Sequence, residues 1–189
     1  MSRTWPVAND GGRDHDDSRV STVESGCGGR SHDPGIVISV LDPGSLFPDL
    51  GPKYLGRHLR LQFHDVHGPA ESQVTPTAAQ VTRLLGFIAA WDRRDPMLIH
   101  CRAGIGRSTA AAFIAACFCN PHAEEHRIAV ALRQASPLAR PNETLVALAD
   151  NAMGRRGRMS EAIASTGRNL PWIDVAEGEP FRMPSAFEA

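Results

Sequence analysis

The stretch "PMLIHCRAGIGRST" (residues 96–109) decides the interpretation of this sequence. It starts with an apolar run that ends in His100 and Cys101, and two glycines and an arginine follow within six residues. The run predicts a short buried strand at 96–101, and the apolar residues beyond predict a buried helix at 108–119. The cysteine therefore stands where a strand passes through a glycine-containing loop into a helix.

Such a loop is suited to binding a tetrahedral anion. The N-terminus of a helix offers unpaired backbone N–H groups, and Gly104 and Gly106 let several of them turn toward one centre. Arg107 can close this cradle, because its planar guanidinium grips two phosphate oxygens at once. The same surroundings favour the thiolate form of a cysteine, so Cys101 is the expected nucleophile. Ser108 is expected to donate a hydrogen bond to that sulfur and help it leave.

The spacing from cysteine to arginine is not specific by itself, because arginine is abundant in this chain. Of the twenty lysine and arginine residues, all but Lys53 are arginines. The context is more informative, since "HCRAGIGRST" resembles the signature loop of the cysteine-based protein tyrosine phosphatase superfamily. Residues from about 35 to 158, including "STAAAFIAAC" and "SPLARPNETLVALAD", resemble small bacterial tyrosine-phosphatase-like and dual-specificity-like proteins. The resemblance implies phosphate binding by Arg102, Ala103, Gly104, Ile105, Gly106 and Arg107, and catalysis by Cys101, Arg107, Asp65 and Ser108.

The general acid is the second part of the expected site. The resemblance implies an aspartate on a loop upstream of the cysteine, and Asp65 in "FHDVHG" lies 36 residues before Cys101. It follows an expected strand at 58–63, so a parallel sheet brings it to the edge that carries the cysteine loop. Asp42 and Asp49 also follow a strand and remain alternatives. The Trp-Pro-Asp form of this loop in the family is absent.

Three further residue types are expected near the loop. His100 is expected to brace it by hydrogen bonds, a role that the resemblance implies. Asn142 matches a position where related phosphatases often carry a polar residue near the site, and it is equally well explained as a helix N-cap. His64 and His67 flank Asp65 and are expected to face solvent or substrate. No metal and no organic cofactor is expected.

Elsewhere, apolar periodicity outlines an α/β fold. Strand and helix alternate before residue 120 and helices cluster after it, which favours a three-layer sandwich with a mainly parallel central sheet of about four or five strands flanked by helices. The other expected elements are a strand at 35–41, a helix from Pro76, and helices at 122–135, 142–153 and about 158–165, followed by an extended tail at "WIDVAEGEPFRMP". The basic run "RRGR" (155–158) is expected to be a solvated helix end.

The chain divides into two expected parts. Residues 1–34 are poor in large apolar side chains and are expected to be irregular or partly disordered, with at most one short strand near Arg19–Val23. Residues 35–189 are expected to form a single phosphatase-like catalytic domain that includes a C-terminal helical extension. The full length of 189 residues suits one folded domain with a sizeable core.

Composition bounds the environment and the partners. The net charge of −1 gives no general attraction to nucleic acid or to an anionic membrane. No apolar run approaches the roughly 20 residues of a membrane span, and the first ten residues lack the apolar core of a signal peptide. We therefore expect a cytoplasmic protein with reduced cysteines. The excess of arginine and alanine is typical of a GC-rich bacterial genome, and the oligomeric state stays open.

The sequence thus predicts a phosphatase that hydrolyses phosphomonoesters, protein phosphotyrosine foremost, through a phosphocysteine intermediate. Its expected partner is a phosphorylated protein or a small phosphomonoester. Ala103 and Ile105 add no positive charge to the loop, which argues against highly phosphorylated inositides. One alternative is a phosphate-ester-binding module with little turnover. Another is sulfur or arsenate chemistry, which Arg107 followed by Ser108 disfavours.

Overall fold

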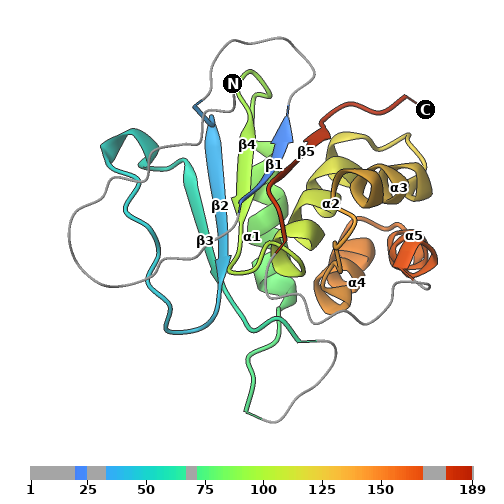
Figure 1. Ribbon diagram of the computed structural model, residues 1–189, viewed down its shortest axis with the longest axis horizontal. Coiled ribbons are helices and arrows are strands. Elements are labelled where there is room, and N and C mark those ends of the chain that lie inside the picture. The colour runs from blue at the N-terminus through green and yellow to red at the C-terminus, as the bar shows by residue number, and fades with distance from the viewer. Residues whose placement is uncertain (1–19, 25–32, 67–71, 168–177, 189) are drawn as a thin grey trace.

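The fold is built on a mixed β-sheet with the strand order β3-β2-β4-β1-β5 (Figure 1). This computed structural model describes residues 20–24, 33–66, 72–167 and 178–188. Strands β2, β3 and β4 run parallel, whereas β1 is antiparallel to β4 and parallel to β5. The strands are β1 (Val20–Glu24), β2 (Ile36–Leu41), β3 (His58–Gln62), β4 (Met97–His100) and β5 (Phe181–Pro184).

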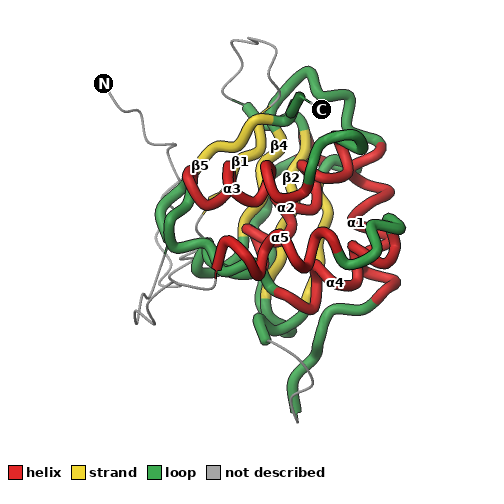
Figure 2. The backbone as a smooth tube through the Cα atoms, turned by 90° about the vertical axis from the view of Figure 1, so that its right-hand side faces the viewer, coloured by secondary structure: helices red, strands yellow, loops and turns green. Residues whose placement is uncertain are grey.

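The helices gather on one side of this sheet, and Figure 2 shows them together in front of the strands. They are α1 (Ala78–Ala89), α2 (Arg107–Cys119), α3 (Glu125–Ala135), α4 (Glu143–Ala152) and α5 (Arg158–Gly167), and a 3-10 turn, η1, covers Pro52–Tyr54. The predicted α/β sandwich on a mainly parallel sheet is confirmed. In the described ranges, no helix combines the length and the apolar composition that a bilayer-spanning segment needs.

Helix α2 is the buried centre of the fold. It contacts β1, β2 and β4 on one side and α1, α3 and α4 on the other. Twelve of its thirteen residues are buried, because its small alanines allow close approach on every side. Packing therefore fixes the position of its first turn, and with it the end of the loop 101–106 that leads into the helix.

The expected elements appear with small shifts of their ends. Strand β1 lies where the sequence suggests a short strand, and its backbone pairs with both β4 and β5. Strand β5 lies within the expected extended tail. The rest of the expected irregular segment, residues 1–19 and 25–32, lies outside the described residues, as do residues 168–177 of the tail.

The basic run at 155–158 is not a solvated helix end, so this expectation is wrong for Arg155. Its side chain is 9% exposed, and Nη1 donates to Glu125 Oε1 at 2.9 Å while Nη2 donates to the Cys117 carbonyl at 2.9 Å. Arg158 joins the same carboxylate from the surface. Burial alone raises the pKa of Glu125, but the hydrogen bond and charge from Arg158 and the charge of Arg155 outweigh it, so this pKa is lower than usual. No local sequence pattern indicates this pair, because Glu125 begins α3 and Arg155 lies 30 residues later in the turn between α4 and α5.

The parallel strands β2, β3 and β4 end at the same edge of the sheet. Three segments leave that edge: one begins at Asp42, one contains Asp65, and one is the loop 101–106 that leads into α2. This edge is where ligands bind in open sheets of this kind.

Candidate active site

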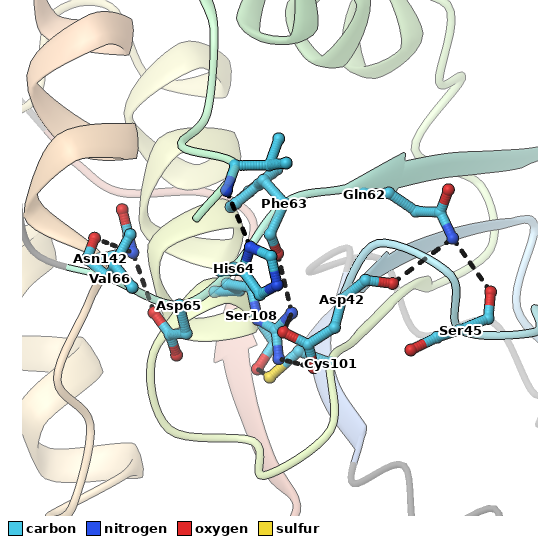
Figure 3. Close-up of polar contacts among 12 residues, drawn as sticks. Asp42, Ser45, Gln62, Phe63, His64, Asp65, Val66, Cys101, Ser108 and Asn142 are labelled. Carbon is cyan, nitrogen blue, oxygen red and sulfur yellow. Dashed lines mark hydrogen bonds and ion pairs between the residues drawn. The ribbon is translucent and has the colours of Figure 1, made fainter. Parts of the chain in front are cut away.

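Cys101 is the first residue after β4, and only 1% of it is exposed. Its Sγ lies 3.2 Å from Ser108 Oγ and accepts a hydrogen bond from the Gly104 N–H at 3.2 Å. Figure 3 shows the sulfur beside Ser108 at the base of the site. The sulfur therefore lies within hydrogen-bond distance of one backbone N–H and one hydroxyl at the start of α2.

Three carbonyl groups of the loop 101–106 accept hydrogen bonds from backbone N–H groups of other segments. The pairs are Gly178 N–H to the Ala103 carbonyl at 2.7 Å, Arg140 N–H to the Ile105 carbonyl at 2.9 Å, and Asn142 N–H to the Gly106 carbonyl at 3.2 Å. Thr109 Oγ1 also donates to the Ile105 and Gly106 carbonyls. In a trans peptide the C=O and the next N–H point in opposite directions. The N–H groups of residues 104, 106 and 107 therefore point away from these donors. The Arg102 side chain, by contrast, is exposed.

The Arg107 side chain is buried beside the loop, with 5% exposed. Nη1 and Nη2 donate to the two carboxylate oxygens of Asp42 at 2.9 and 3.2 Å, and Nη1 also donates to the Phe63 carbonyl at 2.9 Å. Its Nε is buried and has no hydrogen-bond partner among the described residues. A buried donor without an acceptor is costly, so this edge of the guanidinium is suited to an oxyanion.

Asp65 lies on the other side of the cysteine from Asp42 (Figure 3). Its carboxylate covers Gly106 so closely that a Cβ built on that glycine would lie 1.9 Å from Asp65 Oδ2. Only glycine therefore leaves room for this carboxylate beside the loop. The Asp65 side chain is exposed.

Asn142 performs both of the roles that the sequence left open. Its Oδ1 accepts the Leu145 N–H at 2.9 Å and caps α4, while its Nδ2 donates to Asp65 Oδ1 at 2.9 Å and to the Val66 carbonyl at 3.1 Å. The side chain is fully buried. One amide thus links the start of a helix to the carboxylate over the loop.

The rival aspartates have different surroundings. Asp42 holds Arg107, as described, and its backbone carbonyl accepts from Gln62. Asp49 is exposed and accepts the Gly51 N–H at 2.9 Å within its own turn. Of these three aspartates, Asp65 is therefore the one that lies over the loop with a neutral donor, the Asn142 amide, whereas Asp42 is paired with Arg107.

His100 is buried directly before the cysteine, and its Nε2 lies 2.5 Å from Ser39 Oγ. The same hydroxyl lies 2.6 Å from His58 Nε2, so three side chains connect β4, β2 and β3 beneath the site. Burial lowers the pKa of His58 to about 4, and the charges of Arg60 and His100 add to the effect. His64 Nδ1 accepts the Val74 N–H at 2.9 Å, whereas His67 lies outside the described residues.

The sequence does not indicate three contacts around the loop. They join Asp42 to Arg107, Ser39 to His100, and Gly178 to Ala103. Only Asp42 gave a signal, because it follows a strand at the correct edge of the sheet.

The mainly parallel sheet and the cysteine-to-arginine loop at its edge define the class, cysteine-based phosphatases. A family model described as "DSP-PTPase phosphatase fused to NAD+ Kinase" matches residues 53–147, which is half of the chain. The chain therefore belongs to this DSP-PTPase family, within the cysteine-based protein tyrosine phosphatase superfamily, and it carries a phosphatase domain. It matches no curated protein.

Proposed function

We propose that this phosphatase domain hydrolyses phosphomonoesters, phosphotyrosine in proteins foremost, through a phosphocysteine intermediate. The observation that carries the proposal is the pairing of two features on one loop. Cys101 Sγ accepts the Gly104 N–H, and the buried Nε of Arg107 has no acceptor among the described residues. A phosphoryl group bound there would face the sulfur and satisfy the guanidinium.

In the first step the Cys101 thiolate attacks phosphorus. The S–P bond forms while the P–O bond to the leaving group breaks, and Asp65 gives its proton to the departing oxygen. Arg107 and the loop N–H groups stabilise the equatorial oxygens as charge spreads over them. The Asn142 amide supports this step, because it holds the Asp65 carboxylate over the loop.

In the second step water attacks the phosphocysteine. Asp65, now a carboxylate, takes a proton from that water as the O–P bond forms and the S–P bond breaks. The Ser108 hydroxyl, 3.2 Å from Sγ, stabilises the thiolate as it leaves. The products are inorganic phosphate and the enzyme in its starting state.

The test compares Cys101→Ser with Cys119→Ser in the hydrolysis of p-nitrophenyl phosphate. We expect the first variant to lose activity by about a thousandfold or more and the second to keep it, because Cys119 is buried at the far end of α2. Acid quenching of the wild-type reaction should trap one phosphoryl group on the Cys101 peptide, seen by mass spectrometry.

Undiminished hydrolysis by Cys101→Ser would overturn the nucleophile and the mechanism together. Turnover of a phosphotyrosine peptide against phosphoserine, nucleotide and phosphoinositide substrates tests the substrate class. Saturable binding of phosphotyrosine peptide by the wild-type protein with negligible turnover would instead identify a binding module.

A further inference from the structure

The segment 178–188 reaches the cysteine loop from outside the family match, which ends at residue 147. It contains β5, and beyond that strand it is held by Asn120, whose Nδ2 donates to the Ser185 carbonyl and whose Oδ1 accepts the Phe187 N–H, both at 2.9 Å. At its near end, the Gly178 N–H donates to the Ala103 carbonyl at 2.7 Å. This contact joins a fixed strand to the middle of the loop.

The Ala103 carbonyl and the Gly104 N–H belong to one planar trans peptide unit and point in opposite directions. On one side this unit accepts from Gly178, and on the other it donates to Cys101 Sγ at 3.2 Å. A carbonyl that accepts a hydrogen bond is polarised, which strengthens donation by the N–H of the same unit. A single peptide therefore connects Gly178 with the sulfur.

The backbone register ties this support to the strand that carries the cysteine. In β1, Ser21 is the partner of Phe181 in β5, and the neighbouring Val20 is the partner of His100 in β4. The distance between β5 and the end of β4 is thus set by ordinary strand pairing through β1. Gly178 lies three residues before Phe181, so the same pairing limits how far it can move relative to the cysteine loop.

We propose that Gly178 is a positioning residue of the phosphatase reaction, which holds the Ala103–Gly104 peptide so that its N–H stabilises the Cys101 thiolate. The inference rests on the proposed function, since it assumes that Cys101 is the nucleophile. Gly178 does not contact the reacting atoms and acts through the peptide of the loop.

Close approach explains why a glycine stands at this position. A Cβ on residue 178 would lie 3.1 Å from the Gly104 carbonyl oxygen and 3.3 Å from Ile105 Cγ1. Both distances are tighter than ordinary contacts, and one of the atoms is backbone of the loop itself. Even alanine would therefore push the loop by a few tenths of an ångström.

The experiment uses the full chain with Gly178→Pro, which removes the N–H donor, and Gly178→Ala, which keeps it but crowds the loop. The matched control is Gly86→Ala on α1, where a Cβ meets nothing within 4 Å. Each variant is measured for kcat and KM with p-nitrophenyl phosphate, for thermal unfolding, and for the pH dependence of Cys101 alkylation by iodoacetamide, followed on the Cys101 peptide.

We expect Gly178→Pro to lower kcat/KM roughly three- to tenfold, the loss typical of one hydrogen bond, and to move the alkylation midpoint to higher pH. Gly178→Ala should shift both in the same direction by less, and Gly86→Ala should shift neither. If Gly178→Pro does not fold, the Gly178→Ala comparison decides alone. Wild-type values for both Gly178 variants overturn the inference, as does lost activity with an unchanged alkylation midpoint. Full activity of Cys101→Ser, in contrast, overturns the proposed function itself.

Discussion

The Asp42 carboxylate accepts hydrogen bonds from both terminal nitrogens of the Arg107 guanidinium, at 2.9 and 3.2 Å. The Nε of Arg107 has no hydrogen-bond partner among the described residues. Asp42 directly follows β2 and Arg107 is the first residue of α2, and the two meet at one edge of the sheet. Asp42 therefore fixes the plane of the guanidinium through its two terminal nitrogens, and the Nε edge is where the proposed phosphoryl group would bind.

Asp42→Asn should lower kcat/KM about tenfold, because an amide supplies one acceptor where the carboxylate supplies two charged ones. The loss should be the same for substrates with good and poor leaving groups, since Arg107 acts on the phosphoryl oxygens. Asp49→Asn is the matched control, because Asp49 is exposed and accepts the Gly51 N–H within its own turn. A loss confined to poor leaving groups would identify Asp42 as the general acid.

Asp65→Asn should lower kcat by roughly a hundredfold or more for phosphotyrosine, whose phenol leaves as a poor leaving group. Aryl phosphates with strongly acidic phenols should lose much less, because they need no proton to depart. The measurement is a plot of kcat against leaving-group acidity for the wild type and the variant. Parallel plots would remove Asp65 from the role of acid.

Asn142→Asp separates the two roles of Asn142. Aspartate keeps the helix cap, but its second oxygen then faces Asp65 and the Val66 carbonyl in a buried position, so the free energy of unfolding should fall by about 1–3 kcal/mol. The hydrogen bond to Asp65 is lost and a like charge replaces it, so kcat should fall about tenfold and the pH optimum should move upward. Equal kcat and an unchanged optimum would leave Asn142 as a cap alone.

His58 predicts a dependence of stability on pH. Burial, with Arg60 and His100 nearby, lowers its pKa from 6.5 to about 4. As the pH falls below about 6.5, His58 becomes protonated in the unfolded chain, whereas in the folded protein it stays neutral until the pH is near 4. The free energy of unfolding therefore decreases as the pH falls through this window. His58→Asn should show a shallower decline of the urea midpoint between about pH 7 and about pH 5. Identical slopes in both proteins would contradict this assignment.

Arg155→Met should destabilise the fold by about 3 kcal/mol, because Glu125 is left buried with one partner fewer. Arg158→Met is the control, since that side chain is half exposed and should matter less. Turnover per folded molecule should stay at the wild-type value in both variants, measured at a temperature well below unfolding. A larger effect of Arg158→Met would reverse our ranking of the two contacts.

The strands and helices could be predicted because their apolar periodicity is local. The all-round apolar pattern at 108–119 identified the central helix, and the rule for parallel strands placed Cys101 and Asp65 at the same edge. The strand order could not be predicted, because β1 and β5 pair across most of the chain. The partners of Arg107, Arg155 and Ala103 depend on that order and on helix packing, so no local pattern could reveal them.

The pairing of Ser21 with Phe181 also sets an order of events during synthesis. Strands β2, β3 and β4 and helix α2 leave the ribosome long before residues 178–184, so the cysteine loop can fold while its last support is still missing. Contacts between distant parts of a chain form late, because closing so long a loop is slow. If Cys101 is the nucleophile and Gly178 positions its loop, as we propose, a nascent chain would hold Cys101 in place before the Gly178 donor is available, and the thiol would reach its full reactivity only when β5 pairs with β1.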